Sequence, residues 1–128
     1  MDDSPVDGCV FCHNTRERVF DSARVYAIAD AFPVSPGHTL VISKRHVPSY
    51  FELDEAEQRE MWAAVATVQR ELSRRLLPGG FNVGFNVGAV AGQTIMHAHI
   101  HVIPRFHGDM EDPRGGVRGV IPGKQKYG

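Results

Sequence analysis

The chain lacks a large excess of charge of either sign, and it lacks any long apolar run. Its formal net charge is −1 at pH 7, so no strongly basic field is available to attract nucleic acid or a membrane surface. No apolar stretch approaches the ~20 residues that a membrane-spanning helix needs. The first residues are acidic and contain no apolar segment of the kind found in secretion signals. These absences predict a cytoplasmic protein that has neither nucleic acid nor a membrane as a partner.

Cysteine is also scarce, with two residues in 128. In a reducing cytoplasm these two are not expected to form a structural disulfide. The length and the 42% hydrophobic content suffice for one core, so residues 1–128 are predicted to form a single domain. Residues 1–8 are expected to be a flexible tail. Residues 109–128 are expected to be an irregular tail, because residues 112–128 contain five glycines and two prolines.

The periodicity of the remaining chain predicts an α+β domain with an antiparallel sheet and one long helix. The helix is expected to begin after Asp54, which forms a capping box with Glu57, and to end at Pro78-Gly79-Gly80. Its apolar residues at helical spacing are Met61, Val65, Val68, Leu72 and Leu76. Short strands are expected at residues 19–20, 24–30 and 38–43. Residues 81–87 alternate between apolar and small polar types, and are expected to form a hairpin with the segment that follows.

The most informative segment is Ile95-Met96-His97-Ala98-His99-Ile100-His101-Val102-Ile103. Successive side chains of a strand point to opposite faces. A strand here would place His97, His99 and His101 on one face and the apolar residues between them on the other. Three imidazoles in a row contribute little to packing, which favours a chemical role. A His-rich surface tract is the alternative, but such a tract does not need an apolar residue in every gap.

Two chemistries fit such a face. Three histidines could hold a catalytic Zn²⁺, or one imidazole could attack a substrate while its neighbours position it. The upstream loop, residues 88–94, favours the second. It is rich in glycine and alanine, and glycine allows backbone N–H groups to approach an anion closely. A phosphate at the head of a histidine strand indicates phosphoryl or nucleotidyl transfer.

The segment His97-Ala98-His99-Ile100-His101-Val102-Ile103 resembles the His-x-His-x-His signature of the histidine-triad family of nucleotide hydrolases and transferases. The flanking Ala91-Gly92-Gln93-Thr94 and Pro104-Arg105, and residues 36–46 upstream, are also similar to that family. The resemblance implies an antiparallel α+β fold that usually pairs as a homodimer. It also implies cleavage at the α-phosphate of a purine nucleotide. Dinucleoside polyphosphates and nucleoside phosphoramidates are both open as substrates, and the basic C-terminal tail slightly favours a polyphosphate.

The resemblance assigns catalytic roles to individual histidines. His99, the middle histidine, is expected to attack phosphorus and form a nucleotidyl-histidine intermediate. His101 is expected to donate to the phosphate. Either His38 or a backbone carbonyl is expected to orient His99 and fix its tautomer.

Other residues are expected to bind the substrate. Four groups would stabilise the charge on the phosphoryl oxygens: Asn86, the Gly92 N–H, Gln93 and Thr94. Asp30 is expected to accept hydrogen bonds from the ribose hydroxyls. Four apolar residues are candidates for the base pocket, although each could equally belong to the core: Phe11, Phe20, Ile28 and Phe32.

A Cys-x-x-Cys pair, Cys9 and Cys12, could contribute two ligands to a structural zinc site. The resemblance to zinc-bearing members of the family implies His46 and His97 as the other two. His13 is a competing ligand because it directly follows Cys12. The alternative is a pair of reduced, buried thiols. No organic cofactor is expected.

Two other functions remain open. A hydrolase with zinc on three histidines would lose activity directly when the metal is removed. A zinc-stabilised module that binds nucleotide or nucleic acid would show no turnover, and the lack of a basic face argues against it.

Overall fold

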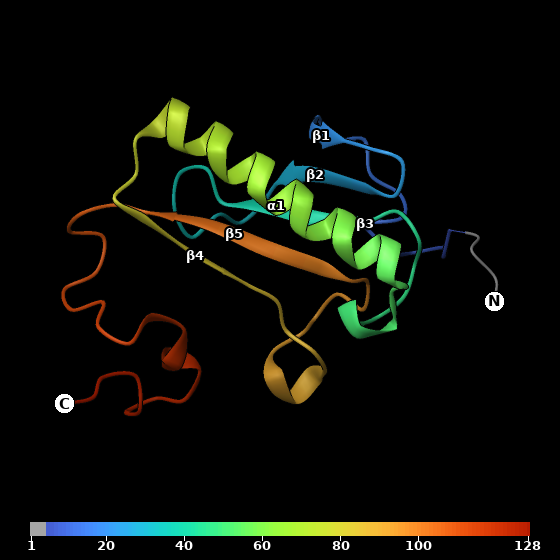
Figure 1. Cartoon of the computed structure of the whole chain (residues 1–128). Coiled ribbons are helices and arrows are strands. Elements are labelled where there is room, and N and C mark those ends of the chain that lie inside the picture. The colour runs from blue at the N-terminus through green and yellow to red at the C-terminus, as the bar shows by residue number, and fades with distance from the viewer. Residues whose placement is uncertain (1–4) are drawn as a thin grey trace.

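A five-stranded antiparallel sheet carries one long helix across one of its faces (Figure 1). The structure is a computed structural model and describes residues 5–128. The strands are β1 (Arg18–Asp21), β2 (Val25–Ala29), β3 (Thr39–Ser43), β4 (Gly80–Gly84) and β5 (His99–Arg105). Their order in the sheet is β1-β2-β3-β5-β4. The predicted α+β class, with an antiparallel sheet and one long helix, is confirmed.

The long helix α1 (Glu55–Leu76) begins at the predicted cap. The Asp54 side chain accepts the Glu57 N–H, and the Glu57 side chain accepts the Asp54 N–H, which satisfies two free donors of the first turn. The helix ends two residues before Pro78, with Leu77 in the left-handed region at φ 51°. This cap sets the C-terminal end of the helix where the chain turns back into β4.

The two faces of the sheet are covered differently. The helix packs against one face, whose buried residues are Val25, Ala27, Val41, Ile100 and Val102. The opposite face carries a smaller apolar cluster, formed by Phe11, Tyr26, Ile28, Leu40 and Ile42. Strand pairing sets Leu40 opposite His101 and Ile42 opposite His99. Because paired residues share a face, these two histidines lie on the side of the sheet that the helix does not cover.

Strand β5 begins later than the sequence pattern predicts, at His99 rather than Ile95. The backbone before it turns: the His97 N–H donates to the Ile95 carbonyl at 2.9 Å, and the Ala98 N–H donates to the Val47 carbonyl at 2.8 Å. His97 is therefore not part of the strand that carries His99 and His101, although its ring lies on the same side of the sheet, where Phe11 contacts both His97 and His99. Hydrogen bonds to residues distant in sequence hold this segment, from the His97 ring to the Ser43 carbonyl and from the Ala98 N–H to the Val47 carbonyl.

Strand β4 pairs with β5 as expected, but it ends at Gly84 rather than at residue 87. Phe85 packs against an aromatic cluster, with ring centroids 4.8 Å from Tyr50, 5.7 Å from Phe51 and 6.4 Å from Trp62. This packing draws the chain away from the sheet and into the loop of residues 85–98. The loop contains the 3₁₀ helix η2 (Ala89–Ala91), and it delivers the chain to the start of β5.

Two further 3₁₀ helices complete the described chain, η1 (Tyr50–Glu52) and η3 (Gly116–Val120). The second belongs to the C-terminal segment, which runs beyond β5 and past the β4 side of the sheet (Figure 1). The expected N-terminal tail lies partly outside the described residues, since these begin at residue 5. Within residues 5–128 we find no helix that combines the length and the apolar character needed to cross a membrane.

Candidate active site and metal cluster

A cavity of about 750 Å³ lies on the sheet face that α1 does not cover. Its lining includes all three residues predicted to be catalytic, His38, His99 and His101. The residues predicted to bind substrate also line it: Asp30, Asn86, Gly92, Gln93 and Thr94. The fold thus brings these groups, which lie far apart in the sequence, to one cavity.

The ring of His99 is held by the backbone. Its Nδ1 lies 2.7 Å from the carbonyl oxygen of His97. A carbonyl oxygen only accepts hydrogen bonds, so Nδ1 carries the proton and Nε2 keeps its lone pair. Burial also lowers the pKa of His99 below its usual value. A neutral imidazole with one nitrogen lone pair free is the form that a nucleophile requires.

A second series of hydrogen bonds fixes His101 through His38. The Val34 N–H donates to His38 Nδ1 at 3.1 Å, so Nε2 of neutral His38 carries the proton. That Nε2 lies 3.0 Å from Nδ1 of His101, which accepts. The remaining nitrogen of His101, Nε2, is therefore a donor. Of the two candidate orienters of His99, the backbone carbonyl of His97 makes the contact, and His38 positions His101 instead.

Both residues of this pair are uncharged at neutral pH. Burial lowers the pKa of His101 to about 4, and the neighbouring imidazoles of His99 and His38 add to this shift. Burial also lowers the pKa of His38, although the carboxylate of Asp30 opposes the shift. The hydrogen-bond directions given above hold only for neutral rings, so the low pKa values and the geometry agree.

Asp30 directly follows β2, at the edge of the cavity. Its Oδ1 accepts the Phe32 N–H at 2.8 Å, and its Oδ2 lies 3.4 Å from His38 Nε2. Three of the four candidate base-pocket residues line the same cavity, namely Phe11, Ile28 and Phe32. Phe11 meets the His99 ring edge-on, with centroids 5.0 Å apart. Phe32 is 88% exposed, so its ring is free to pack against a bound base.

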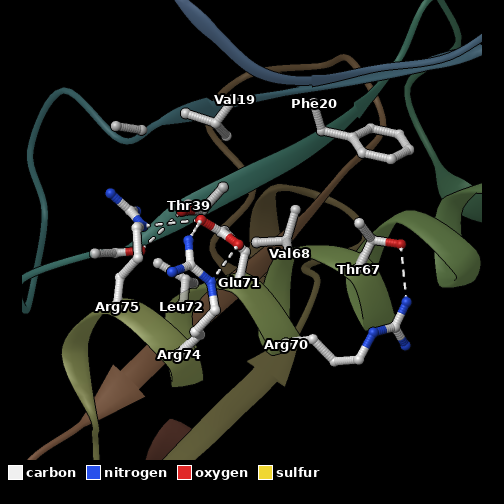
Figure 2. A pocket seen from close by; sticks show the side chains of 12 residues that line it. Val19, Phe20, Thr39, Thr67, Val68, Arg70, Glu71, Leu72, Arg74 and Arg75 are labelled. Atoms are coloured by element: carbon white, nitrogen blue, oxygen red, sulfur yellow. Dashed lines mark hydrogen bonds and ion pairs between the residues drawn. The ribbon is translucent and has the colours of Figure 1, made fainter.

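Phe20 does not belong to this cavity. It pairs with Ala27 across the strands and so packs on the helix side of the sheet, whereas Ile28 lies on the other side. A register shift between Arg18 and Phe20 in β1 sets this orientation. Phe20 lines a separate cavity of about 500 Å³ between β1 and α1, where the rim carries arginines of the helix (Figure 2). Its expected role as a base-pocket wall is wrong.

Two of the predicted phosphate donors are occupied within the loop of residues 85–98. The Gln93 amide nitrogen donates to the Pro48 carbonyl at 2.6 Å and to the Ile95 carbonyl at 3.0 Å. The Gly92 N–H donates to the Ala89 carbonyl at 3.0 Å. These two residues therefore shape the loop. Asn86 and Thr94 are exposed at the cavity, and neither side chain has a hydrogen-bond partner in the part of the chain that the structure describes.

Beside the cavity, the residues Cys9, Cys12, His46 and His97 form a cluster whose ligand atoms all lie within 4.8 Å of one another. Cys9 Sγ is 3.4 Å from His97 Nδ1, and Cys12 Sγ is 3.3 Å from His46 Nδ1. The two Nδ1 atoms are 3.1 Å apart. A tetrahedral zinc with ordinary bond lengths separates its nitrogen and sulfur ligands by about 3.3–3.8 Å. The four residues therefore fit a Cys₂His₂ zinc site.

The backbone also prepares His97 as a ligand. Its Nε2 lies 2.6 Å from the Ser43 carbonyl oxygen, so Nε2 carries the proton and the Nδ1 lone pair faces the cysteines. The side chain is fully buried, and burial lowers its pKa to about 4. His13, the competing ligand, lies outside the cluster and faces Asp7, with Nε2 3.9 Å from Oδ1. Its position after Cys12 does not bring its ring to the other ligands.

The same geometry bears on the alternative of zinc held by three triad histidines. The ligand groups found among residues 5–128 divide the triad, because His97 lies with the cysteines and His101 lies with Asp30 and His38. The described residues contain no ligand set made of the three triad histidines.

Sequence reasoning missed some of the groups that fix these rings. The Ser43 carbonyl sets His97, and the Val34 N–H sets His38. Both are backbone atoms, so residue type carries no signal for them. The separation of His97 from β5 was also missed, because its apolar neighbours continue the alternation of a strand.

Residues 13–108 match the HIT domain family. An uncharacterised HIT-like protein of Mycoplasma genitalium is 32% identical over 83% of this chain and 79% of its own length. AP-4-A phosphorylase of Mycobacterium tuberculosis is 38% identical over 66% of this chain, but over only 44% of its own length. A solved structure of a zinc-bound histidine triad family protein from Mycobacterium smegmatis superposes with a TM-score of 0.75 at 32% identity, covering 82% of this chain and 80% of the other.

Proposed function

The chain belongs to the histidine-triad family, and from this premise we propose that it is a nucleotide hydrolase or nucleotidyl transferase with His99 as its nucleophile. The observation that carries the proposal is the hydrogen bond from His99 Nδ1 to the His97 carbonyl, 2.7 Å long, in a ring that lines a cavity of about 750 Å³. It leaves Nε2 unprotonated in a ring whose pKa is lowered by burial. The bond proposed for cleavage joins the α-phosphate of a purine nucleotide to a leaving group.

In the first step, the lone pair of His99 Nε2 forms a bond to the α-phosphorus as the bond from phosphorus to the leaving group breaks. The electron pair of the broken bond stays on the leaving group, which takes a proton from water. In the second step, the hydroxide part of that water bonds to phosphorus, and the bond to His99 breaks. The ring returns to its neutral form, and its Nδ1–H keeps the hydrogen bond to the His97 carbonyl throughout.

The phosphoryl oxygens would receive hydrogen bonds from three side chains that line the cavity, His101, Asn86 and Thr94. The His101 donor is set in advance by His38, which limits the reorganisation needed when charge builds up on the oxygens. Asp30 would bind the ribose hydroxyls, and Phe11, Ile28 and Phe32 would contact the base. Gly92 and Gln93 would hold the loop that closes this side of the site.

We propose a structural role for zinc, held by Cys9, Cys12, His46 and His97. The fit of the four ligand atoms supports it. When bound, the ion would join the N-terminal segment to the residues around β3 and β5. Neither the cysteines nor His97 and His46 line the cavity of His99. In the proposed step the attacking atom is His99 Nε2, so the step does not require a metal-bound water.

A homodimer is the proposed assembly. Strand β4 lies at one edge of the sheet, and an edge strand offers unpaired backbone groups to a second chain. Apolar side chains are exposed beside it, among them Phe51 at 68%, Trp62 at 41% and Val87 at 41%. Sedimentation velocity should show a dimer at micromolar concentration. A monomer under those conditions would contradict this assembly.

The test of the proposed function is to trap the intermediate. The protein is mixed with an adenosine 5′-phosphoramidate that carries ³²P at the α-position and is quenched within milliseconds to seconds. Label should appear on the wild-type chain in an acid-labile bond, and it should be absent from His99→Ala. His107→Ala is the matched control, because His107 is exposed and does not line the cavity. Turnover without label on any histidine would overturn the nucleophile assignment.

A further inference from the structure

A cavity of about 500 Å³ lies between β1 and α1, on the side of the sheet opposite to the cavity of His99 (Figure 2). We refer to it as the β1–α1 cavity. Alternation along the strands separates the two spaces. Ala29 and Thr39 line the β1–α1 cavity, whereas their neighbours Ile28 and Leu40 line the cavity of His99. Among the described residues the two cavities share no lining side chain, so the reaction proposed above does not use the β1–α1 cavity.

The walls of the β1–α1 cavity are apolar. Val68 and Leu72, both buried, line it from α1. Val19 and Phe20 line it from β1, although neighbours in a regular strand point to opposite faces. The register of β1 shifts between Arg18 and Phe20, and such an irregularity turns a side chain to a different face. Val19 is 54% exposed, so an apolar ligand that covered it would remove apolar surface from water.

Small residues leave this space open. Strand β2 turns Ala27 and Ala29 toward the helix, and neither side chain extends far from the sheet. At one end of the cavity the backbone of Gly37 packs directly against the end of α1. A Cβ atom added to Gly37 would lie 2.5 Å from Leu76 Cδ1 and 3.1 Å from Leu72 Cδ2. The cavity is therefore closed at that end, and its volume falls in the range of small-molecule pockets, about 300–1,000 Å³.

The rim of the β1–α1 cavity is positively charged. Three arginines of α1 line it, Arg70, Arg74 and Arg75, together with one carboxylate, Glu71. Arg74 donates to Glu71 at 2.6 Å and 3.2 Å, and Arg75 Nε lies 3.6 Å from the same carboxylate. Arg70 instead donates to the Thr67 hydroxyl at 3.3 Å, and it makes no ion pair with the described residues (Figure 2). The rim therefore has a surplus of positive charge, and Arg70 is the guanidinium without an anionic partner.

We propose that the β1–α1 cavity binds a medium-chain aliphatic carboxylate, with its chain between β1 and α1 and its head group at Arg70. A guanidinium presents parallel N–H donors that match the two oxygens of a carboxylate. The walls suit a chain without polar groups, because the buried Thr39 hydroxyl already donates to the Gly37 carbonyl at 2.8 Å. An amine of the same length would bring a further cation to a rim that already has a surplus. The site is separate from the proposed reaction, so its test needs no turnover.

The test is a titration of the ¹⁵N-labelled chain with sodium octanoate, followed by two-dimensional NMR. Amide signals of residues that line the β1–α1 cavity should move together and give a Kd on the order of 0.1–1 mM. Hexanoate should bind about fivefold more weakly, since it lacks two methylene groups that the walls would bury. Octan-1-amine has the same chain and the opposite charge, and it should bind at least about tenfold more weakly than octanoate.

Two variants test the wall and the rim. Val19→Glu places a carboxylate beside the proposed chain and should weaken octanoate binding about tenfold. Arg70→Gln removes the unpaired cation and should weaken it about fivefold, as expected for a partly exposed ion pair. Val90→Glu and Arg59→Gln are the matched controls, because they make the same changes at exposed positions outside the cavity, and both should keep the wild-type Kd. Circular dichroism of all four should match the wild type, since each position is exposed.

Three results would overturn the proposed site. The first is equal affinity for octanoate and octan-1-amine, because the arginines would then have no part in selecting the ligand. The second is a wild-type Kd in both Val19→Glu and Arg70→Gln, or octanoate-induced shifts confined to residues of the His99 cavity. The third is movement of the β1–α1 signals on dilution of the protein without octanoate, which would mean that a second copy of the chain covers this face. The nucleophile assignment would survive each of them, because label on His99 tests it independently.

Discussion

His97 and His99 are two residues apart, and they belong to different sites. In each residue one ring N–H donates a hydrogen bond to a backbone carbonyl: Nε2 of His97 donates to Ser43, and Nδ1 of His99 donates to His97. The other nitrogen of His97 meets three ligand atoms in a fully buried cluster. The ring of His99 instead lines an open cavity. The same side chain, held by the same kind of backbone contact, is thus the proposed zinc ligand in the first case and the proposed nucleophile in the second, and the groups that face the free nitrogen distinguish the two.

The largest expected effect comes from removing the nucleophile. His99→Ala should lower kcat by about 10⁴-fold or more, since covalent catalysis has no substitute route in the site. Nucleotide binding should stay within a few fold, because Asp30 and the base-pocket residues are untouched. Single-turnover kinetics and calorimetric titration with adenosine monophosphate measure the two quantities. Turnover of His99→Ala close to that of the wild type would contradict the assignment of His99 as the nucleophile, and with it the difference in role between His99 and His97.

The matching change at His97 should affect stability instead. His97→Ala removes one of four proposed zinc ligands and opens a space in a buried cluster. At free zinc about a thousandfold above its Kd, losing the bound ion costs about 4 kcal/mol of unfolding free energy. Urea unfolding and elemental analysis check this. His13→Ala is the control, because His13 neighbours Cys12 but lies outside the cluster. Full metal content and stability in His97→Ala would contradict the ligand assignment.

The sequence, together with its family resemblance, predicted much of this arrangement, including the placing of His97 with the cysteines, but not where β5 begins. The capping box at Asp54 and the pairing of β4 with β5 follow from local patterns, since each depends on neighbours in the chain, whereas the residues of the cavity were expected from the resemblance to the histidine-triad family. The start of β5 does not follow from a local pattern, because Ala98 pairs with Val47 and His97 folds toward Ser43. Both hydrogen bonds join residues distant in sequence, and both are accepted by backbone carbonyls. Strand alternation alone does not distinguish the three histidines, and it was the family resemblance that implied a zinc ligand at His97 and a nucleophile at His99.

The positions of Phe20 and Gln93 also could not be predicted from local sequence patterns. A register shift in β1 turns Phe20 to the helix side of the sheet. Gln93 is buried at 5% exposure, and its amide bonds to the carbonyls of Pro48 and Ile95. In both cases residue type suggests a contact with substrate. The contact that each side chain makes instead depends on residues distant in sequence, and a single sequence does not give the position of those residues.

Removing the metal from the wild-type chain tests the separation of the two sites directly. A chelator titration should lower the melting temperature by several degrees, because a bound ion adds stability only to the folded chain. At temperatures below the new transition, kcat should stay within about twofold, since the step at His99 uses no metal-bound water. Circular dichroism and turnover are recorded on the same samples. Loss of rate at constant structure, with recovery on adding zinc, would favour a metal-generated nucleophile.

The smallest expected effect is on pH dependence, and it comes from His101. Its pKa in the folded chain is about 4, against an ordinary value of 6.5. Below pH 6.5 the unfolded chain therefore binds a proton that the folded chain does not, so unfolding free energy falls as pH drops from about 6.5 toward 4. Above pH 6.5 this group contributes no slope. Because His38, His99 and Asp30 also face the ring and share the titration, the contribution of His101 alone is on the order of 2 kcal/mol.

The measurement is the unfolding free energy at each pH, obtained by urea unfolding with zinc held constant. The acid limb of this curve, below pH 6.5, should be shallower for His101→Asn than for the wild type. Asn keeps a donor at this position but does not titrate, and His107→Asn, which changes an exposed histidine outside the cavity, should leave the limb unaltered. Superimposable limbs for the wild type and His101→Asn would mean that the fold does not hold the ring neutral, and would contradict the assignment of His101 Nδ1 as an acceptor from His38.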